Sequence, residues 1–160
     1  MFLTRRVAVA EKEEGINENM SSIINVKPNL TDPNIFSLLA PSTFDPTLEK
    51  LKKRAEKYKY NERIHAYAYL YCDKYVGIVV FETDGNRATV LDIAVTERYR
   101  ELGFGTRLID SIFENFEVST LTAETDDDAV NFYLKCGFKI IQTKTVFDTK
   151  RYVCEKTLNF

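Results

Sequence analysis

Two glycines that stand one residue apart, Gly103 and Gly105, separate an apolar run from a segment with helical periodicity. Glycine within a helix is about 1 kcal/mol less favourable than alanine, so helix formation alone gives no reason to place it there. Backbone N–H groups at a helix N-terminus lack partners and carry the positive end of the helix dipole. With no side chains in the way, a phosphate can reach these groups, and Arg100 can add a charged hydrogen bond. The stretch predicts either a pyrophosphate-binding loop or, more simply, a tight turn.

Two common phosphate-binding motifs do not fit this stretch. The nucleotide P-loop needs G-x-x-x-x-G-K-[ST], and that pattern does not occur in the sequence. The dinucleotide fingerprint needs G-x-G-x-x-G, but the third residue after Gly105 is Leu108. A phosphate-binding loop here is therefore of another kind.

The pattern of apolar residues predicts an α/β fold. Three strand-like runs between residues 63 and 95 are separated by short turns, which is typical of an antiparallel meander. The order strand, glycine loop, helix, strand and helix follows, which predicts a βαβ unit inside a mixed sheet. Strands are expected at 22–26, 63–72, 75–82, 88–95, 118–125, 138–147 and 151–160, and helices at 31–40, 47–60, 106–116 and 126–137.

The length of 160 residues suits one compact domain. Strand-like residues begin after Met20, so we expect a folded domain over 21–160, preceded by an extension over 1–20. Two alternatives stay open for this extension. Either it is poorly ordered, or residues 4–10 add one more strand to the sheet.

Charge and cysteine content exclude several classes of protein. A net charge of −2 gives no sign of a nucleic-acid-binding surface, and no stretch approaches the roughly 18 apolar residues of a membrane span. The three cysteines, Cys72, Cys136 and Cys154, are odd in number and lack metal-ligand spacing. The apolar piece at 7–10 is too short for the core of an export signal. We expect a cytoplasmic protein with reduced thiols that uses no metal and binds neither nucleic acid nor membrane.

Two motifs in the chain resemble those of the GCN5-related N-acetyltransferase (GNAT) superfamily. The acetyl-CoA signature of that family, [RQ]-x-x-G-x-[GA], follows an apolar strand by a few residues, as the segment from Arg100 to Gly105 does here. A later helix of the family carries a tyrosine followed by x-x-x-G-F, which corresponds to Tyr133, Gly137 and Phe138. The order and separation of the two motifs are those of the family, which favours a binding loop over a mere turn.

The resemblance covers roughly residues 23–158, with both motifs inside 91–138. It implies a GNAT fold, with a mixed, mostly antiparallel sheet of six or seven strands flanked by about four helices. It also implies transfer of an acetyl group from acetyl-CoA, the co-substrate, to a primary amine. The acceptor is expected to be a small-molecule amine or a protein amine, with a slight preference for a small molecule, and the protein a monomer or homodimer. Two alternatives stay open: a regulatory module that binds acyl-CoA without turnover, and a transferase that uses another acyl-CoA.

The same resemblance implies which residues bind acetyl-CoA. Pantetheine is expected along the strand that ends in Val95, and pyrophosphate at the N–H groups of residues 102–106. Many family members have a cofactor-binding asparagine seven residues before the tyrosine. Asp126 stands there in this chain, and Asn131 is the candidate substitute. The expected cofactor-binding residues are Ile93, Ala94, Val95, Arg100, Glu101, Leu102, Gly103, Phe104, Gly105, Thr106, Asn131 and Tyr133.

Acetyl transfer to an amine needs a group that accepts the amine's proton and a donor for the departing thiolate. Tyr133 is the candidate donor, and its alternative role is that of an aromatic ring packed against the sheet. Glu124, at the end of a strand, is the candidate base, although it would equally suit the solvent side of that strand or the start of the following helix. Asp92, inside an apolar strand, is a second candidate that is either buried or exposed. His65 is expected to be a surface residue rather than a catalyst.

Overall fold

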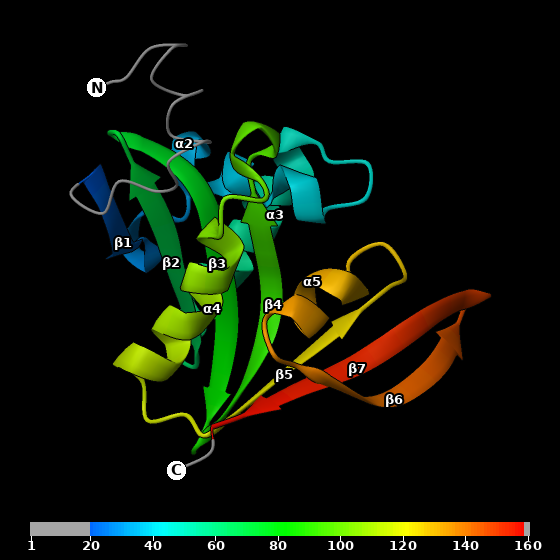
Figure 1. The fold of residues 1–160 in the computed structure, drawn as a ribbon. Coiled ribbons are helices and arrows are strands. Elements are labelled where there is room, and N and C mark those ends of the chain that lie inside the picture. The colour runs from blue at the N-terminus through cyan, green and yellow to red at the C-terminus, as the bar shows by residue number, and fades with distance from the viewer. Residues whose placement is uncertain (1–19, 159–160) are drawn as a thin grey trace.

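The computed structural model describes residues 20–158, so the expected extension over 1–20 and the alternative strand at 4–10 lie, apart from Met20, outside the described residues. Within those residues one mixed sheet has the strand order β1-β2-β3-β4-β5-β7-β6 (Figure 1). Neighbouring strands are antiparallel except β4 and β5, which are parallel. The predicted meander and βαβ unit are therefore confirmed, and the last two predicted strands pair as an antiparallel hairpin. The strands are β1 (Ser21–Asn25), β2 (Ile64–Tyr71), β3 (Lys74–Asp84), β4 (Arg87–Val95), β5 (Thr120–Thr125), β6 (Lys139–Val146) and β7 (Thr149–Thr157).

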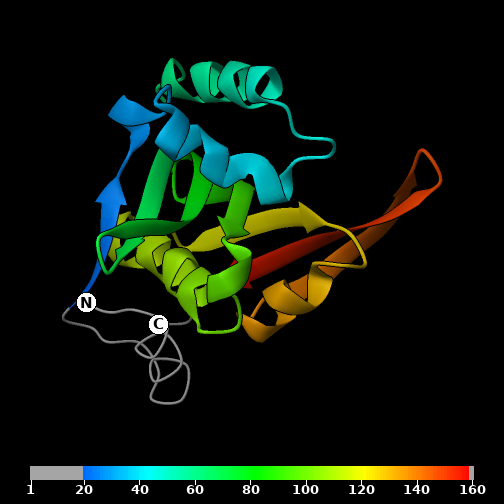
Figure 2. The same ribbon diagram turned by 90° about the horizontal axis from the view of Figure 1, so that it is seen from above.

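Helices cover both faces of the sheet. Figure 2 shows α2, η3 and α3 over one face, called here the α3 face, and α4 and α5 over the other, called the α4 face. No helix within residues 20–158 is long and apolar enough to cross a membrane. The α-helices of this part of the chain are α2 (Pro33–Phe36), α3 (Leu48–Lys59), α4 (Phe104–Asn115) and α5 (Val130–Lys135), and the 3-10 helices are η2 (Lys27–Asn29), η3 (Ser37–Ser42) and η4 (Glu97–Tyr99).

Local chemistry sets the helix boundaries and shortens two of the predicted helices. The hydroxyl of Thr47 accepts a hydrogen bond from the N–H of Lys50 at 3.2 Å and caps α3. Pro41 has no N–H to donate to Ser37, so the first predicted helix passes from α2 into the 3-10 helix η3. The carboxylate of Asp126 accepts hydrogen bonds in the turn that precedes α5, and this turn replaces the first part of the last predicted helix.

Each face of the sheet has its own apolar core. On the α4 face, Phe104 lies among the rings of Tyr69, Tyr71 and Tyr99, with ring centroids 4.6, 5.1 and 6.1 Å away. These contacts attach the first turn of α4 to strand β2 and to the loop after β4. On the α3 face, the core includes the buried stripe of α3, formed by Leu51, Ala55 and Tyr58.

A β-bulge in β4 changes which face its side chains point to. Val80 of β3 lies opposite Asp92, whereas the next residue, Phe81, lies opposite Val90, so Leu91 is an extra residue in β4. Val90 packs in the α4-face core, while Asp92 is buried and Ala94 packs in the α3-face core. The bulge thus turns Val90 and Asp92, two residues apart, to opposite faces of the sheet, and of the two alternatives left open for Asp92 the buried one is found.

We predict that Phe104→Ala lowers the free energy of unfolding by about 3–5 kcal/mol, because it removes a fully buried ring from the α4-face core. Urea denaturation measures this change. Phe147→Ala is the matched control, since Phe147 is 97% exposed and its replacement should change stability by less than about 0.5 kcal/mol. Equal losses in both variants would contradict the assignment of Phe104 to the core.

Candidate functional site

Strands β4 and β5 pair over a short length and then diverge. Their parallel register runs from Arg87 opposite Thr120 to Val90 opposite Ala123. Beyond this point β4 continues to Val95 and is paired only with β3, while β5 turns away (Figure 1). The edge of β4 from Leu91 to Val95 that faces the opening therefore has no strand partner within the described residues. Apart from the carbonyl of Val95, which accepts from Arg100, the peptide groups that point away from β3 are available to an extended chain.

The N-terminus of α4 lies just past the end of β4 and carries a row of free donors. Gly103 is the N-cap residue, and no side chain caps this helix end. Among residues 20–158, no hydrogen bond is formed by the N–H groups of residues 102–106. A Cβ atom on Gly103 would meet nothing within 4 Å, and its φ of 90° is one that L side chains rarely adopt. The residues present therefore fit a bound phosphate.

The structure explains the glycine at position 105 differently from the sequence, which suggested that Gly105 leaves space for a ligand. A Cβ atom on this residue would lie 2.7 Å from Cε1 of Phe132, a ring of α5. The missing side chain thus lets α5 pack against the first turn of α4, rather than clearing space for a ligand. The N–H of Gly105 remains one of the free donors at this helix end.

The other loop residues differ in what they offer to a ligand. The Nε of Arg100 donates to the carbonyl of Val95 at 3.0 Å, which joins the loop to the end of β4. Glu101 is exposed at a φ of 64°. Because the ring of Phe104 is in the core, this residue can offer only its N–H. Thr106, the third residue of α4, is half-buried, and its hydroxyl lies 3.5 Å from Sγ of Cys136.

Tyr133 lies on α5, beside the place where β4 and β5 diverge (Figure 1). Its side chain packs in the α4-face core, and the residue is 6% exposed. Its hydroxyl makes no hydrogen bond within the part of the chain that the structure describes. Burial is the main cause that raises the pKa of Tyr133, and the nearby Cys154, Cys136 and Asp92 raise it further. The hydroxyl is therefore a protonated donor at neutral pH. Asn131, on the same helix, is exposed.

Glu124 is the first residue of β5 beyond its pairing with β4. Its carboxylate lies 2.8 Å from Nζ of Lys144 and 3.5 Å from Nε of Arg151, both on the β6–β7 hairpin. The hydrogen bond from Lys144 is the main cause that lowers the pKa of Glu124. The carboxylate is thus charged at neutral pH and is a weaker base than an ordinary glutamate. The start of α5 is supported by Asp126, not by Glu124.

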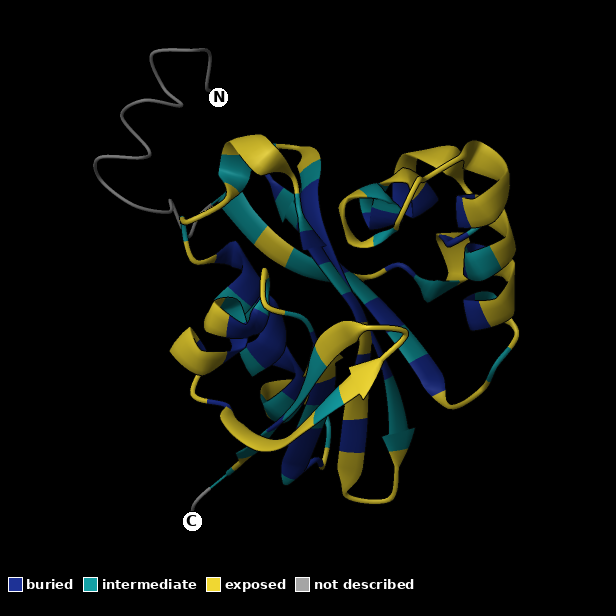
Figure 3. Cartoon of the chain, turned by 90° about the vertical axis from the view of Figure 1, so that its right-hand side faces the viewer, coloured by how far each residue is buried: buried dark blue, intermediate teal, exposed yellow. Residues whose placement is uncertain are grey.

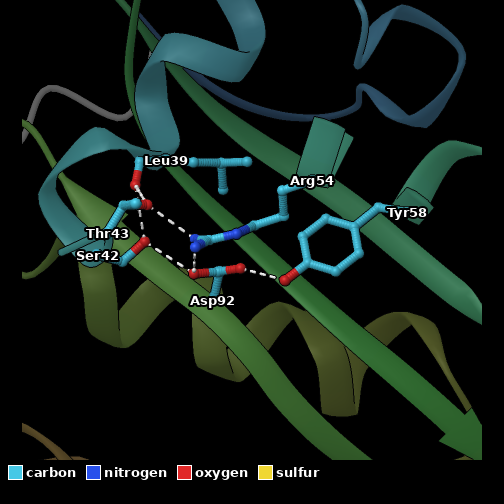
Figure 4. Close-up of polar contacts among 6 residues, drawn as sticks. All are labelled: Leu39, Ser42, Thr43, Arg54, Tyr58 and Asp92. Atoms are coloured by element: carbon cyan, nitrogen blue, oxygen red, sulfur yellow. Dashed lines mark hydrogen bonds and ion pairs between the residues drawn. The ribbon is translucent and has the colours of Figure 1, made fainter. Parts of the chain in front are cut away.

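A polar network around Asp92 was not foreseen from the sequence. Its carboxylate accepts hydrogen bonds from Ser42 at 2.8 Å, from Arg54 at 3.2 Å and from the hydroxyl of Tyr58 (Figure 4). Arg54 also donates to Thr43 at 2.8 Å. An acid in an apolar strand was the only signal in the sequence, because its partners stand far away along the chain.

The network ties η3 and α3 to β4 immediately after the bulge. Asp92 is buried, and three donors occupy its oxygens, so it is not free to accept an amine's proton without losing a partner. Burial is the main cause that raises the pKa of Tyr58. His65 lies outside this network and packs against Phe81 and Phe116.

Comparison with protein families gives one match that spans most of the chain. The sequence model described as an acetyltransferase (GNAT) domain matches residues 12–154. No curated protein matches the chain.

Solved structures with the same fold are numerous but distant in sequence. The ribosomal-protein-S18-alanine N-acetyltransferase from Escherichia coli has a TM-score of 0.69 and 17% identity, covering 88% of this chain and 96% of that one. A GNAT family acetyltransferase from Elizabethkingia anophelis with acetyl-CoA bound has a TM-score of 0.69 and 19% identity, covering 88% and 100%. An aminoglycoside 6'-N-acetyltransferase complexed with coenzyme A has a TM-score of 0.69 and 17% identity, covering 85% and 96%. Likeness at these identities shows the fold alone.

We predict that Tyr58→Phe lowers the free energy of unfolding by about 1.5–3 kcal/mol at neutral pH, because it removes one donor from the buried Asp92 carboxylate. Urea denaturation of both proteins measures the loss. The matched control is Tyr60→Phe, since Tyr60 is 76% exposed and should contribute nothing measurable.

The loss of stability in Tyr58→Phe relative to wild type should also depend on pH. Because the folded pKa of Tyr58 is raised, its contribution is complete below the ordinary tyrosine pKa of about 10 and is lost as the pH rises above it. The stability difference between wild type and Tyr58→Phe should shrink above that pH. A difference that is absent at neutral pH would refute the network's role.

Proposed function

The chain belongs to the GNAT acetyltransferase family, and on this basis we propose that it is an enzyme that transfers an acetyl group from acetyl-CoA to a primary amine. One observation carries the proposal. The unpaired edge of β4 leads directly into the free N–H groups at the start of α4. An extended chain with a phosphate at one end matches this arrangement of peptide groups and donors, and acetyl-CoA has that form.

Two groups of residues are proposed to bind two different parts of the co-substrate. Peptide groups of Ile93, Ala94 and Val95 hold the pantetheine chain by hydrogen bonds of the kind that a strand would otherwise make. The N–H groups from Leu102 to Thr106 hold the pyrophosphate. The loop residues Arg100 and Glu101 and the α5 residue Asn131 are proposed to complete the binding site.

Acetyl-CoA supplies the thioester from which the acetyl group is taken. A C–N bond forms to the amine, the C–S bond breaks, and the amine loses a proton. We assign to Tyr133 a hydrogen bond or proton donation to the departing sulfur, since its hydroxyl is protonated and has no partner in the described residues. Holding both substrates in line beside this hydroxyl supplies much of the acceleration.

Glu124 is the proposed acceptor of the amine's proton, directly or through a water. The two cations beside it lower its pKa, which weakens it as a base and favours the route through water. Because the lowered pKa keeps Glu124 charged at neutral pH, its carboxylate also attracts the ammonium form of the acceptor.

The acceptor itself is proposed to be either a small-molecule amine or a protein amine. The names of two similar structures include a protein residue, the alanine of ribosomal protein S18, and an aminoglycoside. The fold is thus compatible with acceptors of both kinds. The choice between them has to come from residues of this chain.

We predict that Arg100→Gln weakens acetyl-CoA binding about tenfold, because one charged donor near the pyrophosphate is removed. Isothermal calorimetry with acetyl-CoA measures the affinity. Arg98→Gln is the control, since Arg98 is an exposed neighbour that stacks on Tyr99 and should have little effect. Equal effects of the two changes would point to general electrostatic attraction and not to a binding loop.

We predict that Tyr133→Phe lowers kcat and kcat/KM together by about 10²–10⁴-fold, because assistance to the leaving sulfur is needed only in the transition state. The affinity for acetyl-CoA should be unchanged, and the retained ring should preserve the packing of α5. The assay is thiol release with the best amine found, beside calorimetry with acetyl-CoA. Tyr67→Phe, on β2, is the matched control. Full turnover in Tyr133→Phe would make this residue a packing residue only.

A further inference from the structure

Beyond Val90 and Ala123, strands β4 and β5 are no longer paired, and this separation is called here the opening between them. The free donors of α4 and the hydroxyl of Tyr133 belong to helices on the α4 face (Figure 2). A co-substrate bound to them occupies that side of the opening. The acceptor amine must therefore approach from the α3 face.

Three charged side chains lie on the α3 face at the mouth of this opening. Leu121 and Ala123 of β5 pack in the α4-face core, so alternation along β5 turns Glu124 to the opposite face. Arg151 of β7 and Lys144 of β6 lie opposite each other in the hairpin, and both reach the Glu124 carboxylate. Among the described residues, no helix covers this half of the sheet on the α3 face (Figure 2), and β6 is exposed along most of its length (Figure 3).

The charges of this group do not balance. One carboxylate faces two cations, which leaves an excess of one positive charge in a chain whose net charge is −2. The side chain of Arg151 is 31% exposed, and only its Nε has a partner, Glu124, at 3.5 Å. Within residues 20–158, its two Nη atoms form no hydrogen bond. A guanidinium offers these atoms as a fork that fits a carboxylate.

Across the opening, Asp92 offers nothing to a cationic acceptor. Its charge is matched by Arg54, and its oxygens already accept from Ser42 and Tyr58. Polyamines and aminoglycosides carry several positive charges, which would meet the unmatched cation on the other side. The electrostatics of the mouth thus disfavour acceptors of that class.

We propose that the acceptor is a small amine that also carries a carboxylate, such as an α-amino acid. Its ammonium group lies at Glu124, and its carboxylate binds the Nη atoms of Arg151, with Lys144 alongside. Glu124 pairs with the ammonium and Arg151 with the carboxylate of such a zwitterion. Once the ammonium has lost its proton, the remaining carboxylate cancels the excess positive charge of the group. This inference rests on the proposed acetyl transfer and adds the class of acceptor to it.

The experiment compares acceptors that differ only in the carboxylate. Thiol release from acetyl-CoA is measured with the twenty common L-amino acids, with the amide of the best one, and with spermidine. Arg151→Gln should lower kcat/KM for the amino acid by about 10–100-fold and for its amide by less than about threefold. For each acceptor, kcat/KM of Arg151→Gln is compared with that of the wild type. The different intrinsic reactivities of the amino acid and its amide therefore do not affect the comparison of the two losses.

Lys150→Gln is the matched control, because it removes a positive charge from the same hairpin at a residue that stacks on Tyr152. It should change neither rate. Equal losses for amino acid and amide in Arg151→Gln, or turnover of spermidine alone, would overturn the inference while leaving acetyl transfer intact.

A binding measurement separates this inference from the proposed function. Calorimetry of the best amino acid is done on protein saturated with coenzyme A, which has no acetyl group to transfer. If acetyl-CoA binds but no amine is acetylated, the proposed function fails, and the twenty amino acids are then tested by this binding alone. Binding that Arg151→Gln weakens and Lys150→Gln does not supports the carboxylate site, and absence of binding overturns it.

Discussion

The short pairing of β4 with β5 is the constraint on which the candidate site depends. Four residues of each strand pair, and the strands then separate. The remainder of β4 stays in the sheet because β3 pairs along its whole length on the other side. Its free edge therefore keeps the geometry of a strand while lacking a partner, and an extended ligand can replace the missing strand.

The bulge at Leu91 lies where the separation begins, and it decides what surrounds the opening. By inserting one residue, it turns Asp92 away from the α4-face core and toward η3 and α3. A buried carboxylate is unfavourable unless it receives hydrogen bonds, and donors are available only on that side. Ser42, Arg54 and Tyr58 supply them, and η3 and α3 are thereby attached to the strand that is proposed to hold pantetheine.

The two carboxylates at the opening have opposite surroundings. Asp92 is buried and fully engaged, whereas Glu124 is half-exposed and stands between two cations of the β6–β7 hairpin. The charge of Asp92 is thus matched by Arg54, and this pair holds the fold together. The group around Glu124, by contrast, has one more positive than negative charge. The hairpin, which extends past α5 (Figure 1), brings this charge to the site from a distant part of the chain. Specificity for an acceptor is more readily encoded on that side, since its side chains are free to meet a ligand.

Local sequence determined the elements, the meander, the βαβ unit and the glycine loop at the start of α4, because periodicity, turn residues and helix ends act within a few residues of one another. The two motifs also indicated the family. The tertiary structure alone decided the rest. It placed Leu91 in a bulge, which turned Asp92 to the face opposite Val90, and it gave Gly105 its role against Phe132. It also surrounded Glu124 with cations that alternation along a single strand cannot reveal. These features depend on contacts between residues that are distant along the chain, and such contacts are fixed by strand register and helix packing.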